Sequence, residues 1–207
     1  MRFDYPAEYS DAFGRESVRL TSDGAVLRLE LRGFAFEGSS FDVLWPVAVE
    51  AGEAAFNLHQ GCLVDFALEF EVPMPIDRHG GSELCLLFVR VEVTQESEVV
   101  SLRLQLDDLY YASSGRTGGF EDELLSLMRV LPPGVRLRSC FTCAYSDYSP
   151  SGGHMFGGMT CYRDNREAYL QVRTKHDYLT LGGGLPTHEL WLCGEFEPRV
   201  PGTGYRG

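Results

Sequence analysis

The cysteines in the second half of the chain are the residues whose types and spacing could do chemistry. Cys140 and Cys143 form a C-x₂-C pair, and seventeen residues separate Cys143 from Cys161. This spacing reproduces the first three ligands of a four-cysteine zinc site, because two such thiolates reach one ion where the backbone turns between them. The expected place of the fourth cysteine holds Asp164. Cys193 or a histidine must therefore complete the shell.

The histidines offer an alternative fourth ligand. His154 is the best placed of them, since it lies between Cys143 and Cys161 in a Ser-Gly-Gly-His sequence. A Cys₃His shell that includes His154 is thus the runner-up to a Cys₄ shell. In either case all four ligands come from the protein, so the predicted zinc ion is structural, because a catalytic metal needs an open position.

Two other interpretations of the cysteines compete with a metal site. Residues 135–141 alternate as in a strand, and an extended strand through Cys140 would direct Cys140 and Cys143 to opposite faces. Ala144 also replaces the glycine that commonly follows such a pair. On this pattern the cysteines are separate buried residues. A redox dithiol is the third interpretation.

A loop rich in hydroxyl groups and glycine follows the cysteine pair. Ser146, Asp147 and His154 are the residue types of a catalytic triad, but no G-x-S-x-G elbow surrounds Ser146, and triad members come from separated segments. We interpret the stretch as a turn that Asp147 and Pro150 form and Tyr148 anchors. The candidate binding residues of this half are Tyr145, Asp147, Tyr148, Arg163, Tyr205 and Arg206.

The first half of the chain must position any such site with strands, because its apolar residues alternate with a period of two. The pattern predicts five or six strands before residue 112 and places Cys62 and Cys85 in the core. Asp23-Gly24 and His79-Gly80-Gly81 fit turns between antiparallel neighbours. The segments counted are Leu27 to Leu31, Phe34 to Phe36, Phe41 to Trp45, Cys62 to Val72, Glu83 to Thr94 and Val100 to Leu106. A further short strand, Ser17 to Thr21, precedes the Asp23-Gly24 turn.

The second half adds helical patterns. Residues 120–131 repeat their apolar side chains at helical spacing, and Pro132-Pro133 ends the helix. A second, short helix is predicted to start at Asp164, with Glu167 completing a capping box. Residues 189–193 are predicted to form a last strand.

These patterns predict a mainly β fold, an antiparallel sandwich or barrel-like core with one or two short helices in the C-terminal half. The chain divides into an acidic β region, residues 1–112, and a C-terminal α+β unit, residues 113–207. A polar, glycine-rich stretch at 113–119 marks the boundary. The two parts can still belong to a single domain.

Charge and composition limit the classes of partner. Residues 1–112 hold 20 acidic and 8 basic side chains, whereas residues 113–207 hold 10 of each. An acidic surface repels phosphate backbones, which argues against nucleic-acid binding. Such a surface can meet a basic protein partner, but scattered surface acids that serve solubility alone are the leading interpretation. The chain shows no export signal and no apolar run of membrane-spanning length, so we expect a cytoplasmic protein with free thiols and no membrane contact.

Several C-terminal motifs resemble an uncharacterised family of bacterial proteins, known only as a domain of unknown function. The motifs are Phe141-Thr-Cys-Ala-Tyr-Ser-Asp-Tyr-Ser-Pro150, Phe156-Gly-Gly, Cys161-Tyr-Arg-Asp-Asn165, Glu195-Phe-Glu-Pro-Arg199 and Gly202-Thr-Gly-Tyr-Arg-Gly207. The resemblance covers mainly residues 140–207. It implies a bacterial origin and a defined C-terminal unit, and it brings no activity with it.

Two hypotheses for the function follow. The first is a cytoplasmic interaction protein, of the inhibitor or immunity type, whose acidic sheet meets a protein partner and whose C-terminal unit holds a structural zinc ion. The alternative is a thiol- or metal-dependent enzyme, such as a hydrolase, that uses the glycine-rich loop. The first hypothesis leads because the sequence contains no complete enzyme motif.

Overall fold

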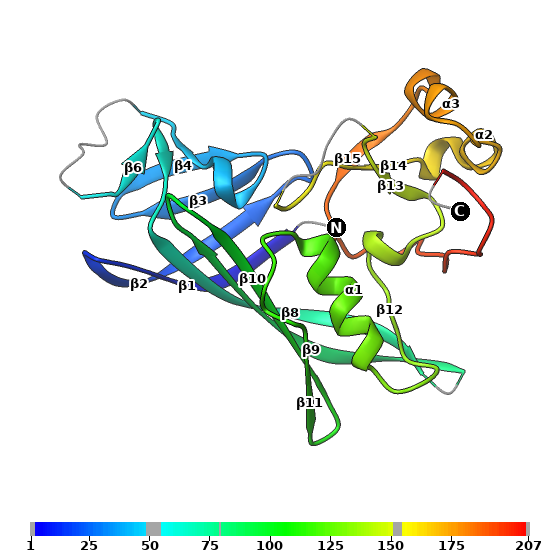
Figure 1. Ribbon diagram of the computed structural model, residues 1–207, viewed down its shortest axis with the longest axis horizontal. Helices are drawn as coiled ribbons and strands as arrows, with labels where there is room; N and C mark the ends of the chain where they lie inside the picture. The colour runs from blue at the N-terminus through cyan, green and yellow to red at the C-terminus, as the bar shows by residue number, and fades with distance from the viewer. Residues whose placement is uncertain (1–2, 49–54, 79, 151–154, 206–207) are drawn as a thin grey trace.

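One large antiparallel sheet dominates the protein (Figure 1). The computed structural model describes residues 3–48, 55–78, 80–150 and 155–205. Neighbouring strands of the sheet follow the order β11-β10-β9-β8-β1-β2-β3-β4-β5. This path ends at β11 and β5, which are not neighbours, so the sheet is open and not a closed barrel. The predicted fold class, mainly β and antiparallel, is confirmed.

The first five strands form a meander in which each strand pairs with the next. Strand β1 is not predicted from the sequence, because Pro6 and the polar residues at its end obscure its alternation. Asp23-Gly24 forms the predicted turn between the second and third strands. The strands are β1 (Phe3–Asp11), β2 (Gly14–Ser22), β3 (Leu27–Leu31), β4 (Phe34–Gly38) and β5 (Trp45–Pro46).

A second meander joins the first at β8. The first part of β8 pairs with β1, and its far end pairs with β12 (Arg136–Leu137). Residues that share one face of β8, β9 and β10 are buried in the alternation that the sequence predicts. The strands of this meander are β8 (Phe66–Arg78), β9 (Gly81–Val93), β10 (Glu98–Leu106) and β11 (Leu109–Ala112).

Short elements connect the two meanders and correct part of the prediction. They are the 3₁₀ helix η1 (Phe41–Val43) and the paired strands β6 (Leu58–His59) and β7 (Cys62–Leu63). The predicted strand from Cys62 is interrupted at Asp65, whose φ is 56°. Cys62 is therefore only half-buried, and Cys85 is half-buried against the core edge. Eleven strands precede residue 113 in the described chain, more than predicted, because several are very short.

Helix α1 (Phe120–Val130) follows the second meander, lies against β10 and β11, and is confirmed as predicted. Phe120, Leu124 and Leu127 point into the same apolar core as the sheet. Glu123 on this helix is buried, and its carboxylate organises the preceding loop. The Ser114 hydroxyl donates to it over 2.7 Å, and the amides of Gly115, Arg116 and Thr117 donate over 2.7 to 3.1 Å.

The remaining chain forms a smaller unit, residues 140–150 and 155–205, which we call the C-terminal unit (Figure 1). The predicted second helix is two helices. The predicted capping box is also wrong: Thr174 and Asp177 form one at the start of α3, and Asn165 precedes α2 without a side-chain cap. The unit contains β13 (Ser146–Tyr148), β14 (Met159–Cys161), β15 (Leu185–Thr187), α2 (Arg166–Leu170), α3 (Lys175–Thr180), η2 (Cys140–Thr142) and η3 (Arg163–Asn165).

The chain passes from one apolar core to the other well after the polar loop at 113–119. Phe120, Leu137 and Phe141 belong to the core of the large sheet, whereas a second apolar cluster starts at Cys143 and contains Tyr162 and Tyr169. The division of the chain at residue 112 remains a prediction. None of the helices in the described ranges is long and apolar enough to span a membrane.

Candidate functional site

The C-x₂-C pair lies in a tight turn. Residues 140–142 form the 3₁₀ helix η2, and the amide of Cys143 donates to the carbonyl oxygen of Cys140 over 3.3 Å. The predicted strand through Cys140 is therefore wrong, since β12 ends at Leu137. The objection that this strand raised against a metal site no longer holds, because a turn lets the sulfurs of Cys140 and Cys143 face the same side.

The small sheet brings Cys161 to this turn. Cys161 ends β14 between Ser146 of β13 and Leu185 of β15. The Cys140 and Cys161 thiols interact with each other, and the Thr187 hydroxyl donates to the Cys140 sulfur over 3.4 Å. Cys161, which is far from the C-x₂-C pair in the sequence, is thus buried in the same region as Cys140 and Cys143.

Cys193 completes the group from the chain beyond β15. Its surroundings are not the predicted strand, because residues 189–193 run through a turn and irregular structure. The amide of Cys140 donates to the carbonyl oxygen of Trp191, which ties the cysteine turn to this segment. Cys143 interacts electrostatically with both Cys161 and Cys193. We call Cys140, Cys143, Cys161 and Cys193 the cysteine cluster.

The thiols of the cluster differ in acidity. Burial raises the pKa of Cys143, and the amides of Tyr145 and Glu197 act against that rise. The interaction with Cys161, together with burial, raises the pKa of Cys140. The same interaction, with help from Arg163, lowers the pKa of Cys161 to about 6. The pair therefore favours one thiol beside one thiolate.

The described residues do not form a ready-made metal shell. No group of three or more His, Cys, Asp and Glu side chains among them is arranged to hold an ion. His154, the runner-up ligand, lies outside the described residues. The four cysteines interact electrostatically, and the strongest interaction is between Cys140 and Cys161. This arrangement suits either thiol chemistry or binding of a soft cation.

The predicted binding loop is held in place by structural contacts. The Tyr145 hydroxyl donates to Glu197 over 2.6 Å, and the Tyr148 hydroxyl donates to Glu189 over 2.7 Å. The Ser146 hydroxyl donates to the carbonyl oxygen of Cys140, so it does not face a base. The triad residue types therefore do not assemble into a triad among the described residues.

Asp147 is the polar centre of the C-terminal unit. Its carboxylate is buried, accepts a hydrogen bond from the Tyr169 hydroxyl over 2.9 Å, and lies 3.8 Å from the Arg199 guanidinium. Burial, with the Asp147 charge adding to it, raises the pKa of Tyr169 to about 12. The Tyr178 hydroxyl contacts the Asp147 carbonyl oxygen over 3.4 Å. Asp147 thus joins β13 to both helices and to the tail.

The last predicted residues lie at the edge of this network. The Arg163 guanidinium lies 3.8 Å from the Cys193 sulfur. The Tyr205 ring packs on Tyr178, with ring centroids 5.1 Å apart. Arg206 lies outside the described residues. The structure therefore brings Arg163 to the cysteine cluster and Tyr205 to the tyrosine cluster.

Sequence reasoning missed a buried ionisable pair at His188 and Glu189. Burial raises the pKa of Glu189 to about 7, while the Gly157 amide and the Tyr148 hydroxyl donate to its carboxylate. Burial among aromatic rings lowers the pKa of His188 to about 3, and neither ring nitrogen has a hydrogen-bond partner in the described chain. An adjacent His-Glu dipeptide between two loops gives no sequence signal for burial.

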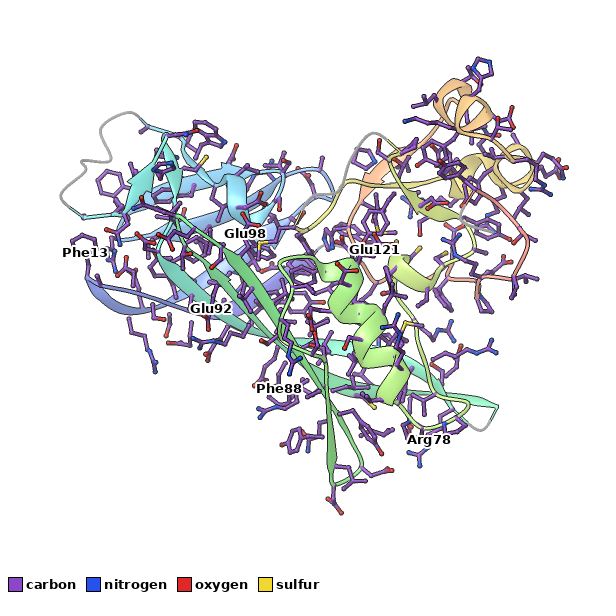
Figure 2. All side chains as sticks on the ribbon, viewed as in Figure 1. Phe13, Arg78, Phe88, Glu92, Glu98 and Glu121 are labelled. Atoms are coloured by element: carbon purple, nitrogen blue, oxygen red, sulfur yellow. The ribbon has the colours of Figure 1, made fainter. Side chains whose placement is uncertain are left out.

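A second candidate site, also not predicted, lies on the outer face of the large sheet, opposite helix α1. Figure 2 shows Phe88 on this side of the strands. A groove of about 750 Å³ crosses strands β1, β8, β9, β10 and the end of β11. We call it the outer-face groove, and its exposed lining is Pro6, Glu8, Glu69, Glu71, Phe88, Arg90, Ser101, Arg103 and residues 112–115.

The outer-face groove has an acidic part and a cation-aromatic part. Glu8 and Glu69 face each other directly across β1 and β8, an unfavourable like-charge pair that Arg90 partly relieves by contacting Glu69. At the other end, the Arg103 guanidinium lies 4.9 Å from the Phe88 ring centroid and 4.8 Å from that of Tyr110.

Two groove charges lack a partner. Within the described part of the chain, neither Glu71 nor Arg103 forms an ion pair. Both are exposed on the same cross-strand row, where Phe88 lies between them. The row therefore presents one free carboxylate and one oriented guanidinium with a ring in between.

Comparison with known proteins gives a family and no activity. No curated protein and no solved structure matches the chain. The model of one family, described as "Family of unknown function (DUF6304)", matches residues 3–146. This region contains the large sheet, helix α1 and the C-x₂-C turn, whereas the motifs behind the resemblance lie mainly beyond it. With most of its length matched, the chain belongs to the family of unknown function DUF6304.

Proposed function

We propose that this protein is a cytoplasmic binding protein, of the inhibitor or immunity type, that holds a basic, extended segment of a protein partner in the outer-face groove. The observation that carries the proposal is the groove itself, with its opposed Glu8 and Glu69 and its unpaired Glu71. A cationic side chain between Glu8 and Glu69 would relieve their mutual repulsion. Binding would therefore remove the electrostatic repulsion between Glu8 and Glu69 that destabilises the free protein.

The cation-aromatic end supports a peptide as the occupant. Arg103 is exposed but oriented between two rings, so its N–H groups can donate to a backbone carbonyl or to an acidic side chain of the partner. Phe88 offers an apolar contact midway along the groove. The order of carboxylates, Phe88 and Arg103 along the groove fits a peptide that carries a basic residue, a short spacer and then a hydrogen-bond acceptor.

The charge of the chain supports a basic partner. Residues 1–112, which include strands β1 to β5 and β8 to β11 of the large sheet, hold 20 acids and 8 bases. Such a field steers basic proteins toward the groove and repels nucleic acid. Placing the protein in the cytoplasm fits its free cysteines, because a reducing compartment keeps them as thiols.

The proposal is tested by titrating the full chain with defined peptides. The probe is a fluorescent ten-residue peptide with two lysines in a Gly-Ser background, and its control carries glutamates instead. We expect the lysine peptide alone to bind, with affinity that falls as salt is added, and amide shifts at Phe88 and Ser101 in the NMR spectrum. Equal binding of both peptides, or shifts confined to another face, would contradict the proposal.

Substitutions in the groove sharpen this test. Glu71→Gln removes the unpaired charge and should weaken the lysine peptide about tenfold, which is about 1.4 kcal/mol. Glu96→Gln is the matched control, because Glu96 is exposed in the turn between β9 and β10 and outside the groove. Equal effects of the two variants would show that only net charge matters.

A thiol-dependent enzyme is the second candidate, and the Cys161 environment favours it. Cys161 interacts with the Cys140 thiol and lies near Arg163, surroundings that favour a nucleophilic thiolate. Its burial restricts access, which is why the candidate ranks second. One thiol that reacts with iodoacetamide far faster than the others, at a rate that rises through pH 6, would favour the enzyme.

A further inference from the structure

The cysteine cluster has a feature that simple proximity of buried thiols does not explain. In three of its four members, the backbone amide two residues further along the chain interacts with the sulfur. The Glu195 amide donates to the Cys193 sulfur over 3.3 Å. The Tyr145 amide is directed to the Cys143 sulfur, and the Arg163 amide to the Cys161 sulfur.

Amide donors directed at sulfur indicate thiolates. A neutral thiol is a weak acceptor, whereas a charged group forms hydrogen bonds about twice as strong. Cys143 receives a second amide, from Glu197, and Cys140 lies 3.4 Å from the Thr187 hydroxyl. Each sulfur of the cluster thus has at least one donor. Such outer hydrogen bonds hold and orient the ligands of metal sites.

A nearby cation reinforces this interpretation. The Arg163 guanidinium lies 3.8 Å from the Cys193 sulfur and interacts electrostatically with Cys161. Four thiolates around a divalent cation carry a net charge of about −2, and a buried charge of that kind needs compensation. Arg163 supplies it from within the cluster.

We propose that Cys140, Cys143, Cys161 and Cys193 together bind one Zn²⁺ ion in a closed, tetrahedral Cys₄ site. Four thiolates and no oxygen or imidazole donor select a soft, tetrahedral cation. Binding replaces the thiol protons and releases them to solvent. With four protein ligands the ion has no open position, so it is structural.

The ion would join three separate parts of the chain. The turn η2 follows the large sheet, Cys161 ends β14, and Cys193 lies in the segment beyond β15. The gaps between ligands are long, with seventeen residues before Cys161 and thirty-one after it. A cross-link over such loops removes much of the freedom of the unfolded chain. This inference does not depend on the outer-face groove.

The test begins with the full chain purified without an affinity tag in zinc-containing medium. We expect one zinc per chain by plasma mass spectrometry, and release of that zinc as four thiols are titrated with a mercurial reagent. Replacing zinc with Co²⁺ should give the visible absorption of a tetrahedral cobalt-thiolate centre. Both measurements use wild-type protein, so they do not depend on whether a variant folds.

Serine variants assign the ligands. Cys140→Ser, Cys143→Ser, Cys161→Ser and Cys193→Ser should each lower the zinc affinity at least tenfold. Cys62→Ser and Cys85→Ser are the matched controls, because both thiols lie outside the cluster, and they should keep full zinc content. Wild-type protein with less than a tenth of a zinc per chain, or a bond between Cys140 and Cys161 in its place, would overturn the proposal. So would full zinc content in Cys193→Ser.

Discussion

Different kinds of contact stabilise the interior of the large sheet and the interior of the C-terminal unit. The core of the large sheet is built almost entirely from Phe, Leu, Val and Ile side chains. The C-terminal cluster instead contains four tyrosines, a cysteine and few aliphatic residues. The first region can fold by burial of apolar surface. The second depends on directional groups, because hydroxyls, carboxylates and thiols gain stability only when each has its partner.

This difference indicates which substitutions should destabilise each region. Regular strands determine the large sheet, so the loss of one exposed side chain leaves its pairing intact. In the C-terminal unit, Asp147 and the cysteine cluster each connect several elements that have little regular structure. Substitutions at these few centres should therefore have effects out of proportion to their size.

The largest effect is expected at the junction of the two regions. Phe156 is 1% exposed and packs on Phe3, Phe41, Phe120 and His188. Phe156→Ala should lower the free energy of unfolding by about 3–5 kcal/mol, because it leaves a cavity where both regions meet. Urea denaturation measures this, with the exposed Leu109→Ala as control. A loss below about 1 kcal/mol would show that the regions are not coupled there.

Breaking the polar centre of the C-terminal unit should come next. Asp147→Asn removes the charge that faces Arg199 and weakens the acceptor for Tyr169. We expect a loss of about 3 kcal/mol, since the partly buried Arg199 guanidinium loses the carboxylate that it faces and keeps only its hydrogen bonds to neutral oxygens, such as the Cys143 carbonyl. Asp108→Asn, at an exposed turn, is the control for charge alone. If both variants unfold at the same denaturant concentration, the centre is not important for stability.

Helix α1, which packs on the large sheet, carries a comparable polar anchor at Glu123. Burial alone would raise the pKa of Glu123, but hydrogen bonds from residues 113–117 lower it to about 2. The carboxylate therefore adds stability above its unfolded pKa of about 4.5, and this is lost as the pH falls toward 2. Glu123→Gln should cost about 2 kcal/mol at pH 7 and much less at pH 2. A cost independent of pH would contradict this explanation.

The smallest expected effect has the opposite sign. His188 is fully buried against Phe3, Phe156 and Trp191. Its pKa is lowered to about 3, so folding loses stability as the pH falls from about 6.5 toward 3. His188→Phe removes two unpartnered nitrogens and should raise stability by about 1 kcal/mol at pH 5. A destabilised variant would indicate a polar role for the imidazole.

The two regions also differ in how far their sequence predicts them. Alternation in residues 66–76, 87–93 and 100–106 predicts both the strands and their buried face, because the sheet repeats one rule over many residues. Asp65 interrupts the strand because its backbone has a positive φ, and the alternation of apolar residues does not indicate this. The outer-face groove is not predictable either, because its lining comes from five strands whose order is a long-range property.

In the C-terminal unit the sequence points to candidate residues better than it predicts the elements around them. The cysteine spacing singles out Cys140, Cys143 and Cys161, with Cys193 or His154 as the fourth ligand, and a metal bound by these residues remains a prediction. The elements around them were assigned wrongly at 189–193 and near Cys140, because short turns and 3₁₀ segments leave no periodic pattern. Burial of His188 and Glu189 depends on loops that pack from both regions.

The most direct test of the central claim, that a metal holds the C-terminal unit and the large sheet does not need it, is amide hydrogen exchange of the full chain with and without a zinc chelator. Peptides from residues 140–150 and 155–205 should lose protection when the chelator is added, while β8, β9 and β10 keep theirs. Unchanged protection in the C-terminal unit, or equal loss in both regions, would contradict the account.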